Sequence, residues 1–277
     1  MSGRRFVALT ALLAVMMLSA CVPEPGTEAS PSSQASDSPT PTASDAPSPT
    51  PSGDQPESPT APSDPTDPAD PADPAITIEY PLAGATLPVP FVANGTANTF
   101  EATLTIDAVD ASGMQMCVRH LTATSGSGTR GTWQGMLAFP PEEDPLAVTM
   151  RAYTFSARDG SMVDLVQFPV LISPERPDII LTNPRCGDVY DAGGLMLLTG
   201  TAALFEAALT IELRDGRRTI MSLPVTAEEC CVESQFSARL TLPGDLSSGF
   251  YDIAAYSLSA MDGSVENEFI VQIEVRG

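Results

Sequence analysis

The chain has 277 residues, a formal net charge of −22 and a hydrophobic content of 43%, and all 13 of its basic residues are arginine. This hydrophobic content is sufficient for a buried core in one or two domains. The acidic balance argues against nucleic acid and anionic membrane surfaces as binding partners, because both would repel the chain.

The N-terminus has the pattern of an export signal. Two arginines precede an apolar segment, residues 6–18, which is too short to span a bilayer as a helix but suits the centre of a secretory signal. The Leu-Ser-Ala-Cys sequence that ends at Cys21 resembles a bacterial lipobox, in which the cysteine carries lipid. We therefore predict a signal peptide at residues 1–20 and an extracytoplasmic, membrane-anchored lipoprotein. An ordinary cleaved signal peptide is the alternative.

The next segment has the composition of a spacer. Residues 22–75 are almost wholly Pro, Ser, Thr, Asp, Ala and Glu, with ten acidic residues and no basic one. Such a segment has too little apolar surface to offset the entropy of ordering it. We predict that residues 21–75 form a lipid anchor and a disordered linker, which lifts the folded part off the membrane. A tract that carries sugars is a compatible alternative.

The remainder of the chain contains one unit twice. The block GTANTFEATLTI at residues 95–106 recurs as GTAALFEAALTI at residues 200–211, an offset of 105. The block AYTFSARDGS at residues 152–161 recurs as AYSLSAMDGS at residues 255–264, an offset of 103. Two matches in the same order indicate a tandem repeat of about 100 residues per copy, which is the size of a β-sandwich.

Each copy has the local pattern of β-strands. In residues 104–109, Leu, Ile and Ala alternate with Thr, Asp and Val, which predicts one buried and one solvated face. The Asp-Gly pairs that begin at Asp159 and Asp262 lie between apolar runs and predict hairpin turns. We expect about seven strands in each copy, and no segment has a sustained helical period.

These features together resemble a known family. The two repeated blocks, and a proline after the opening strand of each copy (Pro81 and Pro184), are similar to the bacterial spore germination immunoglobulin-like domain. The resemblance implies an all-β chain with two tandem immunoglobulin-like β-sandwiches, domain 1 at residues 76–173 and domain 2 at residues 178–277. It places such domains in surface lipoproteins and other exported proteins, and it implies no settled biochemical activity.

The sequence predicts no catalytic, metal or cofactor site. His120 is the only histidine, and no Gly-x-Ser-x-Gly motif supplies a nucleophile for it, so we expect it on a surface strand position. A lone histidine and the absence of Cys-x-x-Cys spacing argue against zinc.

Two sets of carboxylates are candidate sites. Glu101 and Glu206 occupy equivalent positions in separate copies, which favours a structural role at a strand entry over paired acid-base chemistry. Residues 142–144, Glu-Glu-Asp, lack the ligand spacing of a calcium loop and are expected in a solvated hairpin loop.

Four cysteines follow Cys21, and they are candidates for disulfides in an exported protein: Cys117, Cys186, Cys230 and Cys231. We expect Cys186 to bond one member of the adjacent pair Cys230–Cys231. The other member then reaches Cys117 if the two domains fold against each other. Alternatively, Cys117 remains a buried free thiol or pairs between molecules.

The sequence thus favours a non-enzymatic lipoprotein that binds or positions a partner outside the membrane. The partner is an envelope protein, a wall polymer or a glycan, and the lipid anchor contacts the membrane. Two rival hypotheses are a purely structural spacer and a subunit of a hydrolase. An exposed apolar or aromatic patch would favour binding, and uniformly polar faces would favour a spacer.

Overall fold

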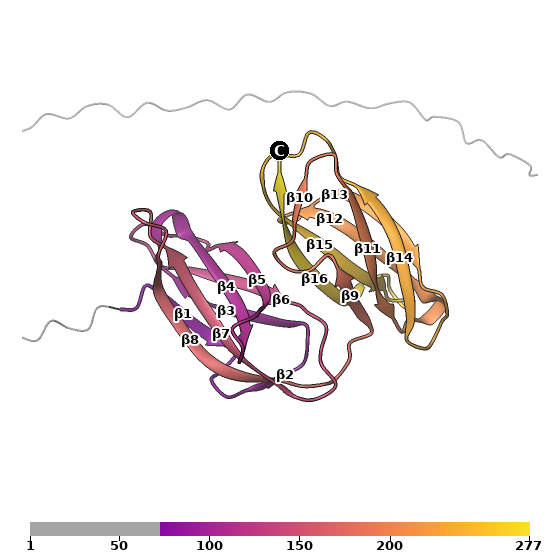
Figure 1. Ribbon diagram of the computed structural model, residues 1–277, viewed down its shortest axis with the longest axis horizontal. Helices are drawn as coiled ribbons and strands as arrows, with labels where there is room; N and C mark the ends of the chain where they lie inside the picture. The colour runs from indigo at the N-terminus through magenta and orange to yellow at the C-terminus, as the bar shows by residue number, and fades with distance from the viewer. Residues whose placement is uncertain (1–72) are drawn as a thin grey trace, which may run out of the picture. The chain divides into compact units, whose positions relative to one another are not determined.

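The computed structural model describes residues 73–277, which form β-strands and two short 3₁₀ turns (Figure 1). The predicted signal peptide at residues 1–20, the lipid on Cys21 and nearly all of the linker at residues 21–75 lie outside these residues. Within the described part of the chain, no helix has the length and apolar character needed to cross a bilayer.

Domain 1 consists of two stacked sheets. The smaller sheet has the order β1-β3-β6 and the larger has the order β2-β8-β7-β4-β5. Their strands are β1 (Ile76–Tyr80), β2 (Thr86–Leu87), β3 (Phe91–Ala97), β4 (Thr103–Asp110), β5 (Gln115–Thr122), β6 (Gly131–Leu137), β7 (Leu146–Phe155) and β8 (Met162–Ile172).

Domain 2 repeats this arrangement, with sheets of order β14-β11-β9 and β10-β16-β15-β12-β13 (Figure 1). Its strands are β9 (Ile179–Asn183), β10 (Val189–Asp191), β11 (Leu195–Ala202), β12 (Ala208–Asp215), β13 (Arg218–Thr226), β14 (Ser234–Thr241), β15 (Gly249–Leu258) and β16 (Val265–Arg276). The all-β, tandem-sandwich prediction is confirmed. Each domain has eight strands where about seven were expected, because the short β2 and β10 pair in parallel with the last strand of their domain.

Close packing of the neighbouring strands requires the glycine in the first repeated block. Gly95 lies in β3 between β1 and β6, and Gly200 holds the equivalent place in β11. A Cβ atom on Gly95 would overlap the carbonyl group of Thr77 and the ring of Trp133. A Cβ atom on Gly200 would overlap the carbonyl oxygen of Ile180 and the Phe236 ring in the same way.

The second repeated block builds the hairpin turn that was predicted. The Asp159 carboxylate accepts hydrogen bonds from the backbone N–H and the hydroxyl group of Ser161, and Gly160 has φ +70°. These hydrogen bonds hold the pKa of Asp159 below its usual value. Asp262 and Ser264 repeat the arrangement between β15 and β16.

The expected alternation fails at Asp107 in β4, which was placed on a solvated face but is fully buried. Its carboxylate pairs with the guanidinium group of Arg151 and accepts a hydrogen bond from the Tyr153 hydroxyl group at 3.2 Å. These two side chains on β7 cover the carboxylate and supply its hydrogen bonds, so a charged group is tolerated away from water.

Domain 2 carries a matching polar cluster on β12 and β15. Glu212 accepts hydrogen bonds from Arg214 and from the Tyr256 hydroxyl group, the latter at 3.0 Å. Tyr153 and Tyr256 are the tyrosines of the repeated Ala-Tyr pair. The repeat therefore preserves a tyrosine that binds a carboxylate on the neighbouring strand.

Candidate functional site at the domain junction

The candidate site lies on β5, the edge strand of the larger sheet in domain 1. In β5, Cys117 pairs with Ala108 and Arg119 pairs with Ile106, so both side chains face the inner side of the sheet at its open edge. An open edge presents unpaired backbone groups and usually needs protection. Residues of domain 2 provide that protection by three kinds of contact.

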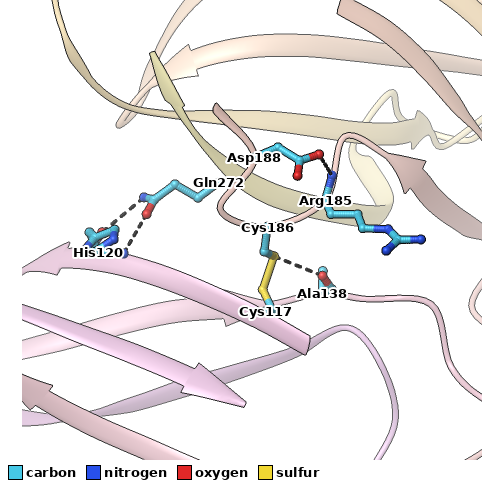
Figure 2. The surroundings of a disulfide bond; sticks show 7 residues. All are labelled: Cys117, His120, Ala138, Arg185, Cys186, Asp188 and Gln272. Carbon is cyan, nitrogen blue, oxygen red and sulfur yellow. Dashed lines mark hydrogen bonds between the residues drawn. A yellow bond between two sulfur atoms is a disulfide. The ribbon is translucent and has the colours of Figure 1, made fainter. Parts of the chain in front are cut away.

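The first contact is covalent. Cys117 bonds Cys186, which lies in the loop between β9 and β10, 69 residues further along the chain (Figure 2). The Gly187 N–H donates to the carbonyl oxygen of Gln272 at 2.7 Å and holds this loop against β16. The Cys186 sulfur lies 3.3 Å from the carbonyl oxygen of Ala138, and Cys117 is fully buried.

The predicted pairing of Cys186 with Cys230 or Cys231 is therefore wrong. Cys186 lies just after the end of β9. The first residue of β9, Ile179, pairs with Ala202 of β11, and Ala202 pairs with Ser234 of β14, which comes just after the adjacent cysteines. The two loops lie at opposite ends of domain 2, beyond the reach of a disulfide. The expected bridge from Cys117 into domain 2 exists, but through Cys186; Cys117 is not a free thiol, and Cys230 and Cys231 are unbonded and exposed.

The second contact is a buried ion pair. Arg119 Nη2 donates to Asp252 Oδ2 on β15 at 2.6 Å, and both residues are about nine-tenths buried, at 9% exposed. Loss of hydration raises the pKa of Asp252, although the Arg119 charge opposes the shift. The pair uses only part of its hydrogen-bonding capacity. Nε and Nη1 of Arg119 and Oδ1 of Asp252 have no partner among residues 73–277.

The third contact is made by His120, which was expected on a surface strand position and is instead half-buried at the junction. The backbone N–H of His120 donates to Gln272 Oε1 at 2.6 Å, and Gln272 Nε2 donates to the backbone carbonyl oxygen of His120 at 3.1 Å (Figure 2). The Gln272 amide thus pairs with the β5 edge as a neighbouring strand would. The imidazole ring stacks on Phe250, with 4.0 Å between ring centroids.

A cleft of about 590 Å³ opens beside these contacts, and its walls come from both domains. The walls combine hydroxyl groups, two phenylalanine rings, an imidazole ring and the buried ion pair. Its main polar and aromatic residues are Thr103, Thr105, Arg119, His120, Thr122, Thr154, Phe155, Phe250, Asp252 and Gln272. Phe155 is 54% exposed and offers an apolar surface at this cleft. Aromatic faces beside hydroxyl and amide groups suit the binding of a partly polar ligand.

The contacts of His120 fix the orientation of its side chain at the cleft. His120 Nδ1 lies 3.1 Å from Thr105 Oγ1, but Thr105 is buried and only 3% exposed. Burial lowers the pKa of His120, and the charge of Glu274 opposes the shift. The nearby Asp252 carboxylate is paired with Arg119. The Thr105 contact and the Phe250 stack therefore orient the imidazole ring as part of the cleft wall.

The other candidate residues are not gathered at this cleft. Glu101 and Glu206 lie in the turns before β4 and β12, with φ of 54° and 61°, one in each domain as expected for strand entries. Residues 142–144 lie between β6 and β7. Among residues 73–277, no group of three or more His, Cys, Asp or Glu side chains could hold a metal ion.

Sequence reasoning missed the junction residues Arg119, Asp252 and Gln272. A signal was available for Arg119, because its long polar side chain interrupts the apolar side of β5 between Cys117 and Leu121. The equivalent positions in the other copy, found from the strand pairing, are Leu223 for Arg119 and Pro169 for Gln272. A difference between the repeats at matched strand positions indicates a residue that one domain uses to contact the other.

Two stacked sheets per domain, repeated in tandem and bridged at the junction, define a tandem immunoglobulin-like protein. The sequence profile of the family described as the immunoglobulin-like domain of bacterial spore germination matches residues 75–161 and 178–264, and the chain belongs to this family.

Similar solved structures are distant. They include fibronectin(III)-like modules of Clostridium thermocellum CbhA, at 16% identity over 73% of this chain and 94% of that chain, with a TM-score of 0.25. A teleost fish polymeric Ig receptor ectodomain has 11% identity over 73% and 98%, with a TM-score of 0.25. An engineered protein has 12% identity and a TM-score of 0.29, and the match covers 39% of this chain but only 22% of that one. At these scores they carry no argument about function. No curated protein matches the chain.

Proposed function

We propose that the chain is a non-enzymatic cell-envelope lipoprotein, anchored through Cys21, whose two domains act together as one binding platform for an extracytoplasmic partner. The partner is an envelope protein, a wall polymer or a glycan. The cleft at the domain junction is the binding site in this proposal.

The observation that carries the proposal is the junction itself. The Cys117–Cys186 bond, the Arg119–Asp252 pair and the Gln272 contact with the β5 edge all join domain 1 to domain 2. A flexible spacer gains nothing from such contacts, whereas a site whose walls come from both domains depends on a fixed arrangement of them. The exposed Phe155 ring at this cleft supports binding over a purely structural role.

The disulfide also agrees with the proposed location. A bond between buried Cys117 and Cys186 is typical of proteins that fold in an oxidising compartment. The lipobox at Cys21 and the export signal before it would deliver the chain to such a compartment.

Photo-crosslinking in intact cells tests the proposal. A photoreactive amino acid in place of Phe155 should give a discrete crosslinked species, because this side chain lies at the cleft. The same amino acid in place of Leu195, which is 62% exposed on the smaller sheet of domain 2, is the matched control. We expect the species to be strongly reduced when the Cys117→Ser/Cys186→Ser double substitution is added.

Identical crosslinking patterns from the two positions, or no crosslinked species from Phe155, would contradict the platform and favour a spacer. A hydrolytic product released from a crosslinked polymer would favour the hydrolase alternative.

A further inference from the structure

The adjacent cysteines Cys230 and Cys231 have no part in the junction. They lie in the loop between β13 and β14, and both are exposed and unbonded. An exported protein that forms one disulfide has its other thiols in the same oxidising surroundings. Two adjacent exposed thiols therefore need an account of their own.

The fold does not need sulfur at position 231, because domain 1 makes the matching turn with a serine there. The Cys231 N–H donates to the Leu204 carbonyl oxygen at 3.0 Å, and the Ser127 N–H donates to the Thr99 carbonyl oxygen at 2.9 Å. Cys231 and Ser127 both have left-handed backbones, with φ of 65° and 53°. Leu204 and Thr99 each precede the Phe-Glu-Ala sequence of the repeat. Serine thus satisfies every backbone requirement that Cys231 meets.

The backbone conformation brings the two thiol groups close enough to interact. Adjacent side chains on an extended strand point to opposite faces, but the left-handed Cys231 interrupts that alternation. Interaction with the Cys230 thiol, first by a side-chain hydrogen bond, raises the pKa of the Cys231 thiol. The two thiols therefore lie close enough to affect each other's chemistry.

We propose that Cys230 and Cys231 form a surface redox site, a dithiol that closes reversibly to a vicinal disulfide. The co-reactant is a disulfide of a small thiol or of a thiol oxidoreductase. One thiolate attacks that disulfide and forms a mixed disulfide, and one thiolate of the co-reactant leaves. The second cysteine then attacks the mixed disulfide, the Cys230–Cys231 bond forms, and a second thiolate leaves. In total, the pair loses two protons and two electrons, and the co-reactant disulfide becomes two thiols.

The two disulfides of the protein then have different roles. A ring closed by adjacent residues is strained, and exposed, strained disulfides are more easily reduced than buried structural ones. Cys117 is buried and Cys186 is half-buried, whereas both cysteines of the adjacent pair are exposed to thiols in solution. The structural bond therefore persists at potentials where the vicinal bond opens and closes.

Redox titration of residues 22–277 tests this site. The protein is equilibrated in glutathione buffers of graded potential, quenched with an alkylating reagent and mapped by mass spectrometry. The peptide that contains Cys230 and Cys231 should change between a doubly alkylated form and an unalkylated form. The unalkylated form should be lighter by two hydrogens than the peptide with two free thiols. The Cys117–Cys186 bond should remain unalkylated across the same range. Closure should accelerate as the pH rises, because the thiolate is the attacking species.

The variant Cys231→Ser is the matched control, because Ser127 shows that serine fits this left-handed turn. It should keep the wild-type circular dichroism spectrum, and its Cys230 should accumulate as a mixed disulfide with glutathione. The proposal is overturned if the wild-type pair accumulates mixed disulfides on either cysteine without ring closure. It is also overturned if both cysteines stay alkylatable at every potential where Cys117–Cys186 is oxidised.

Discussion

At the scale of single residues, the chain places several ionisable groups where water does not reach them, and each is held by a specific partner. Asp107 is covered by Arg151 and Tyr153, and Asp252 is paired with Arg119. A buried charge that loses its partner is far more expensive than one that is replaced together with it. Single and paired substitutions at these sites should therefore have very different effects.

The Tyr153 hydroxyl group predicts an alkaline limit to stability. Burial, followed by the Asp107 charge, raises the pKa of Tyr153 to about 12. The unfolded chain releases this proton near pH 10, before the folded protein does. Stability contributed by the protonated tyrosine is therefore complete below pH ~10 and is lost as the pH rises toward 12. Urea unfolding of wild type and Tyr153→Phe at pH 9, 10 and 11 should show a steeper loss for wild type. Parallel curves would contradict the assignment.

The ion pair at the junction predicts a strongly non-additive pair of substitutions. Arg119→Met leaves the Asp252 carboxylate buried without a partner and should destabilise the protein by about 3 kcal/mol. The double variant Arg119→Met/Asp252→Leu should recover most of that loss, because no unpaired charge remains. Denaturant midpoints of the two single variants and the double variant measure the coupling. Additive effects would mean that the two side chains are hydrated independently.

At the scale of strands and turns, the sequence predicted most of the architecture. Alternation and the two repeated blocks gave the strands, the tandem sandwiches and the Asp-Gly hairpins. Alternation failed at Asp107, because covering side chains come from β7, about 45 residues away in sequence. The junction contacts could not be predicted for the same reason: Asp252 and Gln272 lie 133 and 152 residues away in sequence from the β5 residues that they contact. The predicted disulfide was wrong because the strand register, which the sequence does not reveal, places the Cys186 loop and the Cys230–Cys231 loop at opposite ends of domain 2.

The repeated glycine predicts a large effect from a single methyl group. Gly95→Ala would drive its Cβ atom into the Thr77 carbonyl group and the Trp133 ring, so β1 or the core must shift. We expect a destabilisation of about 2–4 kcal/mol from this overlap. Gly244→Ala is the matched control, because no atom lies within 4 Å of the added Cβ atom. Thermal melts of the two variants should separate clearly, and equal melting temperatures would exclude the packing role.

At the scale of the whole molecule, the chain combines domain 1 and domain 2 with the N-terminal anchor that we propose. The edge strand β5 of domain 1 contacts β15, β16 and the β9–β10 loop of domain 2. Contacts of this kind make the two domains unfold together rather than separately.

Removal of the interdomain bond should therefore weaken both domains. The bond closes a loop of 69 residues, and on the chain-entropy account the double variant Cys117→Ser/Cys186→Ser loses about 4 kcal/mol. In the wild-type protein, both domains should unfold in a single transition. The variant should unfold at a lower denaturant concentration. The Trp133 fluorescence of domain 1, read beside far-ultraviolet circular dichroism, detects any separation of the transitions. An unchanged midpoint would show that the bond stabilises neither domain.

The anchor is tested by Cys21→Ser. Lipid on this cysteine should hold the wild-type protein in the membrane fraction, because each buried CH₂ group of an acyl chain contributes about 0.8 kcal/mol. The variant should be released from membranes or should retain its unprocessed N-terminus. Fractionation and gel mobility measure both outcomes. Identical behaviour of variant and wild type would favour an ordinary signal peptide.

The Cys117–Cys186 bond also determines how the protein carries mechanical load. A pull applied between residue 73 and the C-terminus follows the backbone to Cys117, crosses the sulfur atoms and continues from Cys186. Residues 118–185, which include β6, β7 and β8, then lie in a closed loop that bears no tension. The fully stretched chain is shorter by roughly 230 Å than it would be without the bond, at about 3.4 Å per residue. Residues 118–173 of domain 1 are thus shielded from a pulling force applied to domain 2, whereas β1 to β4 remain in its path.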